Sequence, residues 1–155
     1  MTYTELIRYY HKISASEKYI LGFDYSGIVY YVILTFKELR KYMKEDHESS
    51  KRGHALKVRI RVSADDKKAL LQSGTAIALC EISQLIGKTY NKGDYFEKVI
   101  TETLTGTIWV KNSIPCYQAG DIIYKGEQVQ VKYDSATLIS ETTAKNFKNA
   151  LRLKT

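Results

Sequence analysis

The chain contains few of the residues that mark metal-binding and disulfide-rich proteins. Its 155 residues include only two cysteines and three histidines. Cys80 and Cys116 form no CxxC pair, and no histidine stands at the spacing of zinc ligands, so the sequence predicts no zinc site. We interpret Cys80, which ends the apolar stretch 76–80, as a small buried hydrophobic residue.

Long apolar runs are also missing. No segment approaches the roughly 20 apolar residues that span a bilayer. The most apolar stretch, 21–34, is interrupted by Gly22, Asp24, Ser26 and Gly27. The first residues lack the basic-then-apolar pattern of a signal peptide. We therefore expect no membrane contact and a cytoplasmic protein.

Basic residues and a normal share of apolar residues are present. Lysine and arginine number 24 against 17 acidic residues, which gives a net charge of +7, and 44% of the residues are hydrophobic. This composition predicts a packed core and fits a polyanionic partner. The length suffices for one domain, or for one catalytic core with a small appended module.

The first 89 residues are predicted to form an α/β module. Apolar spacing and turn formers predict, in order, a helix over 3–12, two strands between 19 and 34 around a turn at 24–27, a helix over 35–44, a polar loop over 45–53, a strand over 56–62, and helices over 67–72 and 75–86.

A basic stripe lies within this module. Five cations and no acid occur between positions 51 and 61, namely Lys51, Arg52, Lys57, Arg59 and Arg61. On the alternating strand 56–62, the last three share one face. Such a face suits contacts with nucleic-acid phosphates. The alternative is a solvated edge strand that its charges protect against aggregation.

Residues 90–155 are predicted to form a second unit. The pattern predicts a helix from 93 to 104 that ends at Gly106, a strand over 107–110, a turn at 113–116, a hairpin of strands 121–124 and 127–133, and a helix over 138–151.

The hairpin brings three polar residues together. With Lys125-Gly126 as its two-residue loop, Asp121 lies opposite Gln130. A loop at 126–127 instead places Asp121 opposite Lys132. In both registers Asp121, Gln130 and Lys132 share one face, because the side-chain period of a strand is two.

These residue types suit metal-dependent cleavage of a phosphodiester. Asp121 is a hard oxygen donor for Mg²⁺ or Mn²⁺, and Gln130 offers a neutral amide oxygen or orients a metal-bound water. Lys132 stabilises a hydroxide nucleophile or the phosphate that it attacks. Glu97, on the preceding helix, completes the acidic side of the predicted site.

At these positions the sequence resembles the PD-(D/E)XK nuclease superfamily. Its core is a helix, three strands and a helix, often followed by a further strand. The segment 93–100 with Glu97 resembles its first element, 120–123 with Asp121 its second, and 130–132 with Gln130 and Lys132 its third. The resemblance implies an α+β fold with a restriction-endonuclease-like core over 90–155, preceded by the module 1–89 for DNA contact or dimerisation.

The resemblance also implies a Mg²⁺- or Mn²⁺-dependent endonuclease that acts on DNA. Its metal would be held by Glu97, Asp121 and Gln130. Because a core of this size cleaves double strands as two copies, the resemblance favours a homodimer.

One departure keeps other functions open. Gln130 stands where most members carry an acid, as it does in TnsA-like transposon endonucleases. The amide removes one charge from the metal site. The same fold would then serve as a phage or mobile-element protein that binds nucleic acid, or inhibits a nucleoprotein defence complex, without cutting. A protein-interaction domain with a solvated hairpin face is the third possibility.

Overall fold

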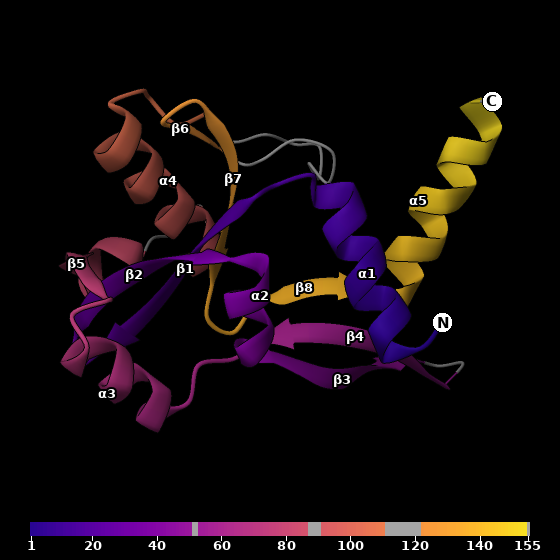
Figure 1. Cartoon of the computed structure of the whole chain (residues 1–155), viewed down its shortest axis with the longest axis horizontal. Coiled ribbons are helices and arrows are strands. Elements are labelled where there is room, and N and C mark those ends of the chain that lie inside the picture. Colours follow the sequence, from indigo (N-terminus) through magenta and orange to yellow (C-terminus); the bar gives the residue numbers. More distant parts are fainter. Residues whose placement is uncertain (51–52, 87–90, 111–121, 155) are drawn as a thin grey trace.

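A mixed five-stranded sheet forms the centre of the molecule, and a three-stranded antiparallel sheet lies beside it (Figure 1). The computed structural model describes residues 1–50, 53–86, 91–110 and 122–154. The larger sheet has the strand order β5-β2-β1-β7-β6, and the smaller one has the order β3-β4-β8. The predicted α+β class is confirmed.

The elements alternate along the chain. They are α1 (Tyr3–Ser14), β1 (Lys18–Tyr25), β2 (Ile28–Thr35), α2 (Phe36–Leu39), the 3-10 helix η1 (Arg40–Tyr42), β3 (Met43–Ser50), β4 (Gly53–Ile60), α3 (Ala64–Gln72), β5 (Ile77–Glu81), the 3-10 helix η2 (Ile82–Leu85), α4 (Lys92–Thr105), β6 (Ile122–Tyr124), β7 (Glu127–Tyr133), β8 (Thr137–Ser140) and α5 (Glu141–Lys154).

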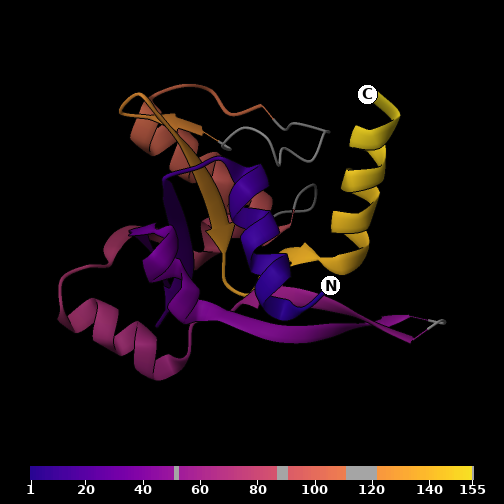
Figure 2. The same cartoon turned by 45° about the vertical axis from the view of Figure 1, so that its right-hand side comes forward.

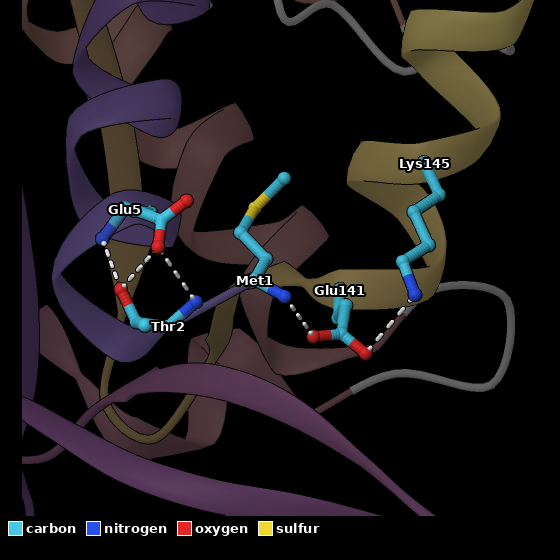
Figure 3. Close-up of polar contacts among 5 residues, drawn as sticks. All are labelled: Met1, Thr2, Glu5, Glu141 and Lys145. Atoms are coloured by element: carbon cyan, nitrogen blue, oxygen red, sulfur yellow. Dashed lines mark hydrogen bonds and ion pairs between the residues drawn. The ribbon is translucent and has the colours of Figure 1, made fainter.

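The first and last helices are fixed by their N-terminal turns (Figure 3). Thr2 and Glu5 form a capping box at the start of α1, where each side chain accepts a hydrogen bond from the other residue's backbone N–H. At the start of α5, Glu141 pairs with the α-ammonium group of Met1 at 3.3 Å and with Lys145 at 3.4 Å. Within the described residues, no helix combines the length and apolar composition needed to cross a bilayer.

Strands from both ends of the chain share the larger sheet. β1 and β2 form an antiparallel hairpin, and β1 pairs in parallel with β7 from Lys18–Val129 to Gly22–Tyr133. The predicted boundary between residues 89 and 90 therefore does not separate two sheets. Parallel neighbours require a long crossover connection, which here is most of the chain.

The alternation of side chains along β1 divides the core in two. Tyr19, Leu21 and Phe23 belong to a cluster that includes α1 and the inner face of the three-stranded sheet. Ile20 belongs to the other cluster, which α4 covers with the fully buried Phe96. The larger sheet thus lies between α1 and α4, as Figure 1 shows.

Gly22 lets α4 approach β1. A Cβ atom at this position would fall on the ring of Phe96. The ring also packs against Tyr133, with 5.2 Å between centroids. Glycine is favoured here because another residue of the core needs the space close to the backbone.

Five sequence predictions are corrected, four of them because the segments concerned, or their neighbours, pair as strands. The predicted loop 45–53 lies largely in β3, which pairs with β4 at eight positions, and the predicted helix 35–44 ends early for the same reason. The predicted helix 75–86 contains β5, which pairs with the edge of β2. Residues 107–110 form no regular strand, and the final helix begins only at Glu141, after β8.

One lysine connects helix α3 to the end of β1 and to the turn after β7. None of its residues is buried. Lys67 donates a hydrogen bond through Nζ to the backbone oxygen of Asp24 at 2.8 Å and pairs with Asp134 at 3.6 Å. Asp134 also accepts a hydrogen bond from the backbone N–H of Val62, just before the helix. This carboxylate therefore fixes both the entry to α3 and its first turns.

We expect Gly22→Ala to destabilise the protein by about 1–3 kcal/mol, because the added methyl group must displace the Phe96 ring. Gly93→Ala, in the first turn of α4, is the control. Its Cβ would meet only Asn91 Oδ1, at 3.3 Å, so the free energy of unfolding should stay the same or rise slightly. Urea denaturation measures both variants. Equal stability of Gly22→Ala and wild type would contradict the close contact.

We expect Lys67→Met to loosen α3 without unfolding the body of the protein. Hydrogen exchange of the amides of 66–72 should become at least several-fold faster, because a hydrogen bond and an ion pair of a half-buried ammonium group are lost. Lys68→Met changes the neighbouring, exposed lysine and should leave these rates unchanged. If both variants exchange at the wild-type rate, Lys67 does not hold the helix.

Candidate active site

The β6–β7 hairpin has the register predicted for the loop at Lys125-Gly126. Tyr124 pairs with Glu127, and Ile122 pairs with Val129. Both loop residues have positive φ values, 53° and 80°, as a type I′ turn requires. Asp121, the residue before β6, lies outside the described residues, so its predicted place opposite Gln130 stays a prediction.

Strand β7 presents two different faces. Val129, Val131 and Tyr133 pack in the cluster beneath α4. Gln130 and Lys132 alternate with them and therefore point to the opposite face, on the side of α1. The predicted pair thus lies on one face.

Gln130 lies in a buried polar corner. Its backbone neighbour in the parallel register is Tyr19, and its side chain is only 3% exposed. The Tyr19 hydroxyl group is 2.7 Å from Ser14 Oγ at the end of α1, and Ser16 donates to the backbone oxygen of Ser14. Both serines are buried. Buried polar groups of this kind are stable only when they are hydrogen-bonded.

These hydroxyl residues were missed by sequence reasoning. Ser14 and Ser16 stand between a helix and a strand, where serine is an ordinary loop residue. The parallel pairing of β1 with β7 brings them close to the candidate site. The positions of these residues in the sequence do not indicate that the serines and Gln130 lie in the same part of the fold.

Lys132 is the second side chain of this face. It is half-buried and lies next to Leu21 of β1. Across the part of the chain that the structure describes, it has neither a hydrogen bond nor an ion pair. An ammonium group that is partly removed from water without a counter-ion attracts an anion. A phosphate group is an anion of the right chemistry.

Glu97 is placed elsewhere. It lies half-buried on α4, the helix that packs on the face opposite Gln130 and Lys132. Within the described ranges, no three acidic, histidine or cysteine residues gather closely enough to hold a metal ion. Of the predicted metal ligands, the described residues place only the amide oxygen of Gln130 at this site. Asp121 lies outside the described residues, and Glu97 lies on the other side of the sheet.

The predicted nucleic-acid contacts lie mainly on β4. Arg59 Nε is 3.1 Å from Asp46, and Lys57 is 4.0 Å from the same carboxylate. Arg61 is exposed just after the strand. Lys51 and Arg52 lie outside the described residues. The carboxylate of Asp46 therefore already neutralises part of the basic stripe.

A second polar cluster closes the ends of β1 and β7. Tyr133 donates a 2.8 Å hydrogen bond to Asp24, whose backbone oxygen binds Lys67. Burial, together with the hydrogen bond to the Asp24 carboxylate, raises the pKa of Tyr133 far above the ordinary 10.0. The cluster ties α3 to the sheet and is covered by that helix.

A surface pocket lies on the other side of the sheet. It has a volume of about 500 Å³ between η2 and α4, where Gln84, Tyr95 and Lys98 are among the lining residues. None of the predicted site residues lines it.

Comparisons of the chain with family models, with curated proteins and with solved structures return no match. An assignment of function therefore depends on the geometry of β7 and on the residues around it.

We expect the raised pKa of Tyr133 to make the protein less stable in alkali. The unfolded chain releases this proton near pH 10, whereas the folded chain retains it, so the stability that is present below pH 10 falls above it by up to about 1.4 kcal/mol per pH unit. Tyr133→Phe should show a shallower fall between pH 10 and 12 in urea denaturation. Equal slopes for the variant and wild type would contradict this assignment.

Proposed function

We propose that the protein is a Mg²⁺-dependent endonuclease of the PD-(D/E)XK type that acts on DNA. The observation that carries the proposal is the face of β7 on the side of α1, where Gln130 lies beside the half-buried Lys132, which has no partner within the described residues. This is the arrangement that the third strand of such a nuclease requires, with an amide in place of the usual acid.

The order and pairing of the elements also support the proposal. α4 precedes the β6–β7 hairpin, as the resemblance requires. The further strand that often follows the second helix of the family has a counterpart in β1, which directly follows α1 and lies beside β7. The N-terminal segment would then complete the core of the nuclease as well as supply DNA contacts.

Each residue has a role in this proposal. Asp121 and Gln130 would hold the metal, without Glu97, which lies on α4 across the sheet. Bound there, Mg²⁺ would supply a Lewis acid for the phosphate and lower the pKa of an attacking water. Lys132 would hold the phosphate oxygen or the hydroxide through its ammonium group, and Tyr19 would fix the position of Gln130.

A DNA-binding protein without nuclease activity is the second candidate, in the manner of a phage or mobile-element inhibitor of a nucleoprotein complex. Two observations favour it. Gln130 is buried to 3% exposure and contributes no charge, and Glu97 lies on the helix across the sheet. A metal ion would then bind weakly, because Mg²⁺ depends on carboxylate ligands.

Plasmid cleavage tests the proposal. Supercoiled DNA is incubated with the protein and Mg²⁺ or Mn²⁺, and then with a chelator. Wild type should nick or linearise the plasmid only with metal. Lys132→Met and Asp121→Asn should each lower the rate at least ~100-fold, because each removes charge stabilisation of the transition state.

The control is Lys125→Met, which removes an exposed lysine from the turn of the same hairpin and should cleave at the wild-type rate. Gln130→Glu is the gain-of-function variant, because it adds the carboxylate that the metal lacks. Binding that persists in chelator, with no cutting by wild type or by Gln130→Glu, would instead establish the second candidate. If the protein neither cuts nor binds DNA, both candidates are wrong.

A further inference from the structure

The β3–β4 pair forms a long ribbon at the side of the molecule. The two strands pair at eight positions, and only the part next to β8 has a third strand beside it. Figure 2 shows the ribbon reaching out from the body, away from α3 and α4. Lys57 and Arg59 lie in the part that β8 flanks, at the base of the ribbon.

The two faces of the ribbon differ in chemistry. Val58 and Ile60 point inward to the core beneath α1. The outer face carries Lys44 opposite Arg59 and Asp46 opposite Lys57. Among the residues whose side chains the structure describes, three cations and one acid share this face, and the exposed Arg61 continues it by one position.

Asp46 is placed to compete with a phosphate group. Its carboxylate lies 3.1 Å from Arg59 Nε and 4.0 Å from Lys57 Nζ, while its own side chain is 43% exposed. A hydrogen bond from the backbone N–H of His47, together with Arg59 and Lys57, lowers the pKa of Asp46. The carboxylate is therefore charged at neutral pH and occupies the donors that a phosphate would use.

Arg59 also connects the ribbon to the candidate site. Its Nη1 donates a 3.1 Å hydrogen bond to the backbone oxygen of Ser135, in the turn that follows β7 and Lys132. A ligand that binds Arg59 on the outer face of the ribbon would therefore contact a residue that is hydrogen-bonded to the turn after β7.

We propose that the outer face of the ribbon is a contact surface for the phosphate backbone of double-stranded DNA, and that Asp46 holds its affinity low by competing with phosphate for Arg59 and Lys57. The inference rests on the proposed function for the identity of the partner. It goes beyond the proposed function by giving Asp46 a role, that of limiting the affinity for DNA. The sequence had predicted only the basic residues of this surface.

The test is binding of a fluorescent 20-base-pair duplex, measured by anisotropy in chelator at several salt concentrations. Asp46→Asn should bind about 3–10-fold more tightly than wild type near 0.1 M salt, and the slope of log affinity against log salt should steepen by about one, because one further phosphate is contacted. Lys44→Ala should weaken binding and reduce the slope by a similar amount.

Two matched controls separate this effect from net charge. Glu127→Gln removes an exposed acid from the distant β6–β7 turn, and Lys37→Ala removes an exposed lysine from α2. Both should leave the affinity within about 2-fold of wild type, since exposed charges farther apart than a Debye length are screened. Thermal melting shows that each variant is folded.

The outcomes distinguish the two proposals. If wild type binds DNA but Asp46→Asn binds no more tightly than Glu127→Gln, the role of Asp46 is wrong while the proposed function stands. If neither wild type nor Asp46→Asn binds and the plasmid is still cleaved, the ribbon is not the contact surface. Loss of both binding and cleavage would remove the proposed function itself.

Discussion

The parallel pairing of β1 with β7 is the constraint on which the other features depend. It joins residues 18–22 to residues 129–133, so most of the chain forms the connection between the two strands. Gly22 lies at the end of this pairing: its neighbour in the register is Tyr133, the Phe96 ring lies against it, and its backbone oxygen accepts a hydrogen bond from the N–H of Asp134. Without this pairing, neither core would be closed.

The same pairing creates the polar corner around Gln130. A glutamine on a hairpin alone would be solvated on its free face, whereas here Tyr19 and the end of α1 bury it. Burial raises the cost of an unpaired polar group, so the buried amide depends on a hydrogen-bonding partner. Beside it, Lys132 has no counter-ion among the residues that the structure describes.

Charge is arranged differently in the two regions that the proposals use. On β7 the described residues offer Lys132 no partner, so an anion can bind there without displacing any of them. On the ribbon Asp46 already occupies two cations, so a phosphate must compete with it. The cations of these ion pairs are largely buried, since the side chains of Lys57 and Arg59 are 14% and 25% exposed, so Asp46, at 43%, is the partner that a ligand reaches most easily.

The sequence by itself determined the local features: helix α1, the β1–β2 hairpin, helix α4, and the β6–β7 hairpin, whose register it left open between two loops. These depend on nearby residues, on the side-chain period and on glycine's tolerance of positive φ. Only the tertiary structure decided that 45–50 is a strand, that β5 replaces a helix, and that Glu97 and Gln130 lie across the sheet from each other. These features depend on pairing and packing between distant segments, which no local pattern specifies.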